Sequence, residues 1–210
     1  MKLVNEWYCC ISAIDKNTCN KILSLVKDNW KETRIDTKAT VTEEERKSGR
    51  ECIYNPNPER RVSDISWSNE QWVWDLIWPY MLEANENAGW KFDIRAVEDA
   101  QITRYKTGGF YKFHKDGFSD HLSTYNYPDN PYLDGFVRKL SMTVLLNDNY
   151  EGGDFQFCTY KEEKHEISTT AANSAGSIIV FPSFLEHRVA PVTKGTRYSL
   201  VSWFVGPPFR

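Results

Sequence analysis

The chain has 210 residues, which is enough for one substantial domain and short for two. Hydrophobic residues make up 40% and charged residues 26%, a balance typical of soluble globular proteins. The net charge of −3 gives no electrostatic reason to expect a nucleic acid or another polyanion as partner.

The N-terminus lacks the apolar run of a secretory signal, and no segment approaches the ~20 consecutive apolar residues of a membrane span. The five cysteines follow no C-x-x-C spacing, which favours reduced thiols over a zinc site. We therefore expect a cytoplasmic protein that makes no membrane contact. We predict a single domain over residues 1–210, with helical support and a flexible loop in 1–90 and the core in 91–210.

Residues 15–30 predict a first amphipathic helix. Asp15 or Thr18 caps its start, and the apolar residues at 22, 23, 25, 26 and 30 share one face. After this helix, residues 31–65 lose hydrophobic periodicity in a run of charges and turn formers. We interpret this stretch as a solvated loop, with a lid over a substrate as the alternative.

A second helix is predicted to open at residues 68–71, Ser-Asn-Glu-Gln, which resemble a capping box. Its apolar stripe would run from Trp72 to Tyr80, one helical turn at a time. We interpret the other tryptophans of this helix as core rather than as a binding surface. Pro79 must kink or divide the helix, and Gly89 is its expected C-terminal stop.

From residue 91 onward the pattern changes from helical to extended, because apolar and polar residues alternate. Turn signals rich in glycine and asparagine separate most segments, and a polar, aromatic loop occupies 117–138. The expected strands are 92–95, 100–105, 139–147, 154–160, 166–170, 177–181, 187–191 and 197–205. Helices followed by many short strands predict an α+β fold, with an antiparallel jelly-roll core and the N-terminal helices packed against it.

His114 and Asp116 are the first candidate functional residues. Side chains two apart in an extended strand project to the same face, so these two can converge on one point. A third ligand is available far along the chain at His187, after several predicted strands. Two histidines and one carboxylate form the facial triad that leaves open positions on non-haem Fe(II).

Arg197 and Ser199 would share one face of the last predicted strand. A guanidinium fork and a hydroxyl on that face can hold one carboxylate inside a barrel. The sequence therefore predicts a site for a small diacid beside the metal.

The second half of the chain contains four blocks whose order matches that of a known enzyme family. They resemble the Fe(II)/2-oxoglutarate-dependent dioxygenases of the prolyl 4-hydroxylase type, and an ordered set of motifs is far more specific than any one of them. The blocks are 101–116, 145–155, 176–183, and 187–192 with 195–203. The resemblance implies a double-stranded β-helix in which His114, Asp116 and His187 bind iron.

The resemblance also implies a pocket for 2-oxoglutarate, in which Arg197 pairs with the distal carboxylate. By position, Tyr105 matches a tyrosine that reaches this co-substrate near the metal, and Trp203 matches an aromatic residue that lines the same pocket. Several relatives place a tyrosine where this chain has Leu145, and that tyrosine helps to hold the distal carboxylate. We expect Ser199 to supply the missing hydroxyl, by strand geometry.

The implied activity is that of an Fe(II)- and 2-oxoglutarate-dependent hydroxylase of prolyl residues in a peptide or protein. It would couple oxidative decarboxylation of 2-oxoglutarate to succinate and CO₂ with hydroxylation of the substrate. The reaction would also use O₂, with ascorbate as reductant. Asp116 favours hydroxylation over halogenation, since halogenating relatives lack this carboxylate.

We expect a peptide or protein substrate, in a groove supplied by residues 31–61 and 117–138. Trp203 and Phe204 occupy the neighbourhood where nucleobase-repair relatives carry a second arginine, so we expect no nucleic acid substrate. One alternative is the same chemistry on another side chain, a free amino acid or a small molecule. An alternative of another class is an inactive β-helix binding module.

Overall fold

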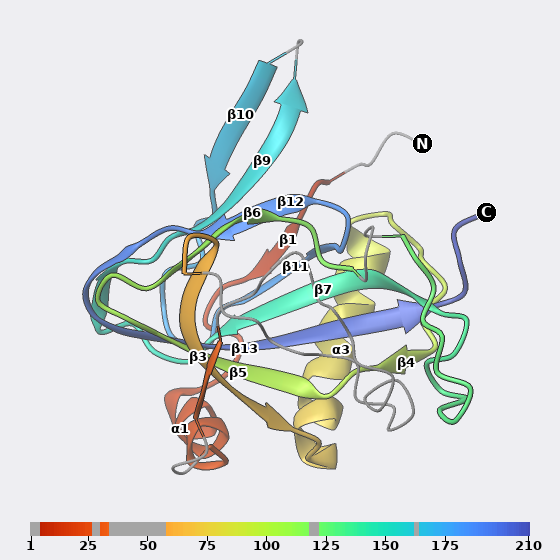
Figure 1. Ribbon diagram of the computed structural model, residues 1–210, viewed down its shortest axis with the longest axis horizontal. Helices are drawn as coiled ribbons and strands as arrows, with labels where there is room; N and C mark the ends of the chain where they lie inside the picture. The colour runs from red at the N-terminus through yellow and green to blue at the C-terminus, as the bar shows by residue number, and fades with distance from the viewer. Residues whose placement is uncertain (1–4, 27–29, 34–57, 118–121, 162–163) are drawn as a thin grey trace.

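The computed structural model describes residues 5–26, 30–33, 58–117, 122–161 and 164–210. Within this part of the chain, antiparallel strands curl into two facing layers, and two helices lie against the outer face of one layer (Figure 1). The elements are β1 (Tyr8–Cys10), α1 (Lys16–Ser24), β2 (Lys31–Thr33), β3 (Arg61–Ser68), α3 (Gln71–Asn87), β4 (Ala96–Val97), β5 (Ala100–Lys106), β6 (Phe110–His114), β7 (Val137–Leu145), β8 (Tyr150–Gly152), β9 (Phe155–Lys161), β10 (Lys164–Thr169), β11 (Ile178–Pro182), β12 (Glu186–Val189) and β13 (Val192–Gly206).

The two layers share one strand. The major sheet has the order β1-β11-β7-β13-β5-β3, with β2 paired to β3 and β4 paired to β13. The minor sheet continues from β3 through β6, β12 and β9 to β10. β3 pairs with β5 over residues 64–68 and with β6 over residues 61–62, so the chain bends from one sheet into the other. This is the jelly-roll, or double-stranded β-helix, architecture that the sequence predicts.

Two groups of buried residues hold the layers together. The helix-side core lies between α3 and the outer face of the major sheet, where Figure 1 shows α3 behind β7 and β13. Its buried members include Val73, Ile77 and Met81 from α3 and Leu140, Met142, Leu200 and Phe204 from the sheet. The barrel-side core lies between the two sheets and includes Tyr105, Leu145, Phe155, Phe157 and Phe181. The candidate site therefore has packed apolar residues around it.

Both helices begin close to the predicted positions, but α1 ends at Ser24 rather than at residue 30. Asp15 caps α1, and its carboxylate accepts from the backbone N–H groups of Asn17 and Thr18 at 2.8 and 3.0 Å. For α3 the predicted capping box is wrong, because Ser68 ends β3 and the N-cap Glu70 makes no side-chain cap bond. The C-terminal stop is confirmed, since Gly89 follows the helix with a φ of 73°.

The predicted stripe of α3 is displaced by one residue. Its fully buried positions are 73, 77, 81 and 84, while Trp72 and Tyr80 are partly buried at the edge of the helix-side core. The helix is apolar on several sides, so spacing alone does not select the buried face. Pro79 lies inside a helix that runs from Gln71 to Asn87 without division.

Several strands differ from the prediction. Residues 92–95 form no strand, and β1, β2, β4 and β8 are too short to give a periodic signal. Residues 31–65 were expected to be a loop, but β2 and the start of β3 lie inside this stretch. The inward-facing Arg61 and Ser63 are polar and buried, which disguises the alternation of β3. Residues 34–57 of the predicted lid, and 118–121 of the loop at 117–138, lie outside the described residues.

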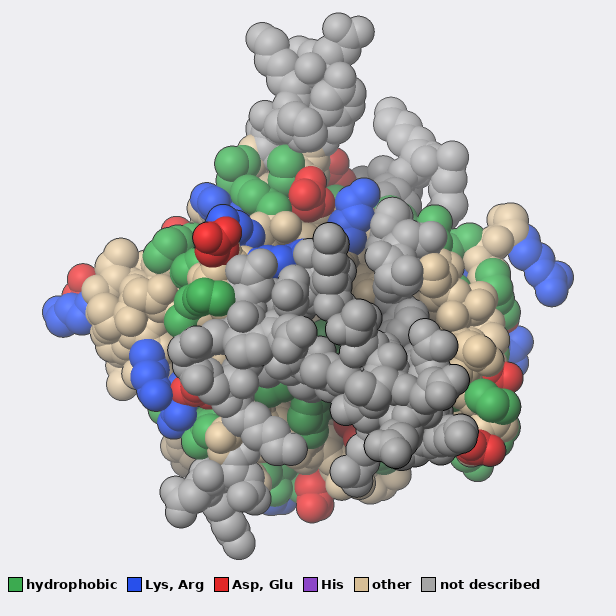
Figure 2. All heavy atoms as spheres, viewed as in Figure 1, with side chains coloured by type: hydrophobic (Ala, Val, Ile, Leu, Met, Phe, Trp, Pro, Cys, Tyr) green, Lys and Arg blue, Asp and Glu red, His purple; other side chains and the backbone are tan. Residues whose placement is uncertain are grey.

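The described surface is mixed in charge. Figure 2 shows basic and acidic side chains interspersed over the described part of one face, and no described histidine is visible there. The second observation agrees with the burial of His114 and His187. Among the described residues, no helix is long and apolar enough to cross a membrane.

Candidate metal centre

The two candidate histidines lie side by side in the minor sheet. His114 is the last residue of β6, His187 lies on β12, and the antiparallel register places them directly opposite each other. Asp116 follows β6 by two residues, and its backbone N–H donates to the Ser183 carbonyl at 2.9 Å. Strand pairing thus joins three residues that are far apart in the sequence.

The donor atoms of these residues converge. The Nε2 atoms of His114 and His187 each lie 3.6 Å from one carboxylate oxygen of Asp116, His114 from Oδ1 and His187 from Oδ2. One potential ligand atom from each residue falls within 4.8 Å of the others, and all three side chains are buried. The predicted triad is therefore assembled in the fold.

Hydrogen bonds fix the orientation of both imidazole rings. Nδ1 of His114 lies 2.8 Å from the Lys112 carbonyl, and Nδ1 of His187 lies 2.9 Å from the Leu185 carbonyl. A carbonyl oxygen only accepts, so each Nδ1 carries a hydrogen and each Nε2 is directed to the shared point. Metal-binding histidines ordinarily donate their other ring N–H to an acceptor in this way.

Electrostatics favour the ligand forms of the side chains. Burial and the neighbouring His187 hold the pKa of His114 well below its usual value, so the ring is neutral. Burial acts to raise the pKa of Asp116, but His187, His114, Arg138 and a hydrogen bond from Ser141 outweigh it and lower that pKa. Asp116 is thus held as a carboxylate.

Aromatic rings enclose the site on two sides. Tyr111 stacks on His114 with ring centroids 3.5 Å apart, and Phe155 stacks on His187 at 5.4 Å. Phe181 lies 4.5 Å from His187 in a tilted arrangement. These contacts restrict both imidazoles and limit the access of water, which strengthens electrostatic interactions at the centre. Two imidazoles and one carboxylate on one side of a point fit Fe(II) of the facial-triad class.

Arg197 is the second predicted feature, and it is buried without a charged partner among the described residues. Its side chain is 1% exposed and lies on β13 opposite Tyr105 on β5, whose ring is 5.6 Å from the guanidinium carbon. Nη1 donates to the Ser199 hydroxyl at 3.0 Å, while Nε and Nη2 have no hydrogen-bond partner in the described part of the chain. A buried cation with unpartnered donors is costly unless an anion completes it.

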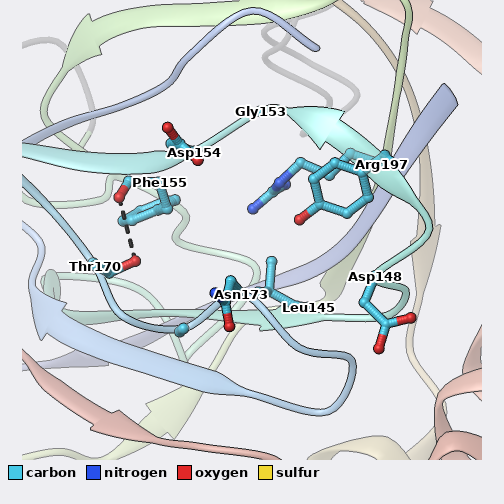
Figure 3. Close-up of a pocket in the computed structure, with 10 residues that line it drawn as sticks. Leu145, Asp148, Gly153, Asp154, Phe155, Thr170, Asn173 and Arg197 are labelled. Carbon is cyan, nitrogen blue, oxygen red and sulfur yellow. Dashed lines mark hydrogen bonds between the residues drawn. The ribbon is translucent and has the colours of Figure 1, made fainter. Parts of the chain in front are cut away.

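A pocket of about 90 Å³ opens in front of Arg197. Figure 3 shows the guanidinium directed into this space, with Leu145, Phe155 and Thr170 around it. Phe155 also stacks on His187, so the pocket and the metal centre share one wall. The complete lining is Leu145, Asp148, Tyr150, Gly153, Asp154, Phe155, Thr170, Ala172, Asn173 and Arg197.

The other predicted pocket residues lie near this space but do not line it. Tyr105 packs in the barrel-side core beside Arg197, and Ser199 bonds to the guanidinium. Trp203 lies farther along β13, with its ring 4.0 Å from the Arg138 guanidinium carbon. Its Nε1 is buried and has no hydrogen-bond partner among the residues that the structure describes. Trp67, which is 41% exposed, lies 6.0 Å from the Trp203 ring. Trp203 thus connects the barrel interior with a more exposed aromatic surface.

The ion pair of Arg138 with Glu98, beside Trp203, is not predicted from the sequence. Arg138 donates from Nε and Nη2 to the two carboxylate oxygens of Glu98, at 2.7 and 2.6 Å. The Tyr125 hydroxyl donates to Oε1 of Glu98 at 2.6 Å. Neither Glu98 nor Arg138 stands in a recognisable motif, and only the pairing of β7 with β13 brings Arg138 to Trp203.

A second buried arginine was also missed. Arg61 donates from Nε to Ser63 at 2.7 Å and from Nη2 to Gln101 at 3.0 Å. Its guanidinium carbon lies 4.7 Å from the ring centroid of Tyr111, the residue that stacks on His114. Among the described residues, Arg61 forms no ion pair with a carboxylate. The signal was hidden in a stretch that was expected to be a loop.

A family model described as the 2OG-Fe(II) oxygenase superfamily matches residues 100–205, half of the chain. A PKHD-type hydroxylase of Xylella fastidiosa (strain M12) is 38% identical over 106 residues. This match covers 49% of the chain but only 42% of that relative. The chain therefore spans less than half the length of the curated relatives it matches in this way.

Two solved structures share the fold over nearly the whole chain. The viral collagen prolyl hydroxylase of Paramecium bursaria Chlorella virus-1, in its 2OG complex, has a TM-score of 0.61 and 18% identity, covering 96% of this chain and 97% of that one. A prolyl hydroxylase from Trichoplax adhaerens, in complex with a peptide fragment of the hypoxia inducible factor oxygen degradation domain, has a TM-score of 0.63 and 15% identity. It covers 95% of this chain and 83% of the other.

Proposed function

The chain belongs to the 2OG-Fe(II) oxygenase superfamily, and from this premise we propose that it hydroxylates prolyl residues in a peptide or protein. The observation that carries the proposal is the combination of an assembled His-Asp-His triad with a buried arginine whose Nε and Nη2 lack partners. The triad selects a metal with open positions, and the arginine selects an anion. Together they fit Fe(II) and 2-oxoglutarate.

The protein residues bind and orient the reactants in the proposed reaction. His114 and His187 would bind Fe(II) through Nε2, and Asp116 through its carboxylate. When bound with 2-oxoglutarate and O₂, Fe(II) supplies the oxidative chemistry that yields succinate, CO₂ and a hydroxylated product. Arg197 would hold the distal carboxylate of 2-oxoglutarate, with Ser199 fixing the guanidinium.

Aromatic residues beside the barrel, of which Trp67 is 41% exposed, support a peptide substrate. Trp67 and Trp203 are neighbours, and Tyr125 stacks on Tyr127 with ring centroids 5.2 Å apart. Aromatic-lined grooves are suited to extended, proline-containing segments, because such segments have a preformed backbone and pack on flat rings. The names of the relatives point the same way: a PKHD-type hydroxylase, and a prolyl hydroxylase bound to a peptide fragment.

Arg61 favours a second candidate function, the same chemistry on a free amino acid. Its hydrogen-bond partners among the described residues are the neutral side chains Ser63, Gln101 and Thr103. The Tyr111 ring lies between its guanidinium and His114. A substrate carboxylate on Arg61 would therefore lie one aromatic ring away from the metal.

The proposal is tested by supplying Fe(II), 2-oxoglutarate, ascorbate and a substrate panel, and by measuring succinate together with the product mass. The panel contains peptides with an internal proline, the same peptides with alanine in its place, and free proline. A mass gain of one oxygen atom on the proline peptides alone supports prolyl hydroxylation. Gain on free proline alone selects the second candidate, and no succinate above the His114→Ala control with any member contradicts both.

A further inference from the structure

The pocket in front of Arg197 needs a second donor. A carboxylate offers about four lone-pair sites, and the free Nε and Nη2 of one arginine can serve only part of them. Leu145 lines the pocket at the position where several relatives of the resembled family place a tyrosine, and it offers no hydrogen bond. Resting on the proposed function, we propose that the Tyr150 hydroxyl is the second donor to the distal carboxylate of 2-oxoglutarate.

Strand pairing places Tyr150 on the Arg197 side of the sheet. Tyr150 on β8 pairs with Gly195 on β13, and Arg197 follows Gly195 by two residues. Residues two apart on a strand share a face, and an aromatic side chain reaches its diagonal neighbour across an antiparallel pair. Gly195 has no side chain that could lie between them, and a Cβ at this position would be 3.4 Å from the Cβ of Tyr150. The phenol therefore has room to lie over Gly195 toward Arg197.

Gly153 shows how close the two side chains lie. A Cβ added at Gly153 would be 3.0 Å from Cδ of Arg197 and 3.3 Å from Cε2 of Tyr150. A single added methyl group at Gly153 would thus contact both side chains. It would touch the aliphatic part of Arg197 and the ring carbon of Tyr150 next to the one that bears the hydroxyl. Tyr150 also lines the pocket into which the guanidinium points. In the described part of the chain, no residue forms a hydrogen bond with its hydroxyl.

The other polar groups that line the pocket already have partners or are exposed at its rim. The Thr170 hydroxyl donates to the Phe155 carbonyl at 3.3 Å, the dashed line in Figure 3. Asp148 is paired with Lys16 at 3.1 Å, and Figure 3 shows its carboxylate directed away from Arg197. Asp154 and Asn173 are exposed at the rim. Of the residues that line the pocket, Tyr150 is the remaining one with a hydroxyl that can face a carboxylate held by Arg197.

The test compares two ligands in wild type and in Tyr150→Phe, with Mn(II) in place of Fe(II) and binding measured by titration calorimetry. The ligands are 2-oxoglutarate and 2-oxopentanoate, which keeps the 2-oxo acid and the chain length but ends in a methyl group. Loss of a hydrogen bond to a charged group predicts about tenfold to hundredfold weaker binding of 2-oxoglutarate in the variant. Binding of 2-oxopentanoate should be unchanged.

A matched control removes a phenol hydroxyl outside the pocket. Tyr198 on β13 packs against Trp30 on the opposite face, so Tyr198→Phe should bind both ligands as wild type does. If Tyr150→Phe binds 2-oxoglutarate like wild type, or weakens both ligands equally, the assignment of Tyr150 is overturned while the proposed function stands. If wild type with Mn(II) binds no 2-oxoglutarate, the proposed function fails, and the assignment fails with it.

Discussion

Replacement of Arg197 by methionine should have opposite effects on stability and on binding. Methionine keeps an unbranched stem but removes the guanidinium, whose Nε and Nη2 are buried without partners. An unpaired buried polar atom costs ~1–3 kcal/mol, so removing two of them stabilises the protein without ligand. Loss of the bond to Ser199 offsets ~1 kcal/mol of this gain. Water that enters the pocket of about 90 Å³ and bonds to the guanidinium offsets a further part.

The net expectation is a gain of about 1 kcal/mol in the free energy of unfolding. For a chain of this size that corresponds to a rise of ~2–4 °C in Tm, measured by calorimetry without 2-oxoglutarate. Binding of 2-oxoglutarate in the presence of Mn(II) should weaken by about tenfold to hundredfold, because a charge-assisted contact is lost. The variant should therefore be more stable and less able to bind.

Arg104 provides a matched comparison on the neighbouring strand β5. Its Nε and Nη2 each lie 2.7 Å from Oδ2 of Asp64, so this arginine is paired in the absence of any ligand. Arg104→Met should lower Tm and leave 2-oxoglutarate affinity unchanged. The reasoning is refuted if Arg197→Met lowers Tm as much as Arg104→Met does, or if it retains wild-type affinity for 2-oxoglutarate.

Three further substitutions test the metal centre and its surroundings. Asp116→Ala should abolish Mn(II) binding in a calorimetric titration while circular dichroism stays native, because the only carboxylate of the triad is gone; wild-type affinity would refute its assignment as a ligand. Ser141→Ala should weaken Mn(II) binding by about tenfold, since the hydroxyl that bonds to Asp116 is lost, and an unchanged titration would show that Ser183 and the backbone suffice. Glu98→Gln should lower the free energy of unfolding by roughly 1–3 kcal/mol, because it leaves the half-buried Arg138 without its charge partner. Denaturant unfolding of Glu98→Gln and of the double variant Glu98→Gln/Arg138→Met measures this effect. Equal stability of wild type and Glu98→Gln would contradict it.

The fold class followed from patterns that are local. Period-two alternation located β5, β7, β9, β10, β11, β12 and β13, and glycine at a helix end located the stop of α3. Strands β1, β2, β4 and β8 were missed because two or three residues give no period. β3 was missed for a different reason. Its inward face carries Arg61 and Ser63, so the usual apolar signal is absent.

The candidate metal centre could be predicted because the types and spacing of its ligand residues indicate this class of site. A histidine and a carboxylate two residues apart, followed far downstream by a second histidine, match the donor preferences of one class of metal site. The register of β6 with β12 then brings His114 and His187 face to face, as the prediction requires. Arg197 was found in the same way, through its strand neighbour Ser199.

The sequence alone thus predicts the donor set, the jelly-roll class and the arginine that we propose binds an anion. Tertiary structure decides which other side chains surround them: Tyr150 beside Arg197, Tyr111 between Arg61 and His114, and the ion pair of Glu98 with Arg138. The physical reason is that these contacts join residues on different strands, or on a strand and a loop. They depend on pairing register, strand twist and side-chain direction, and a change of one residue in register would turn each side chain to the other face of its sheet.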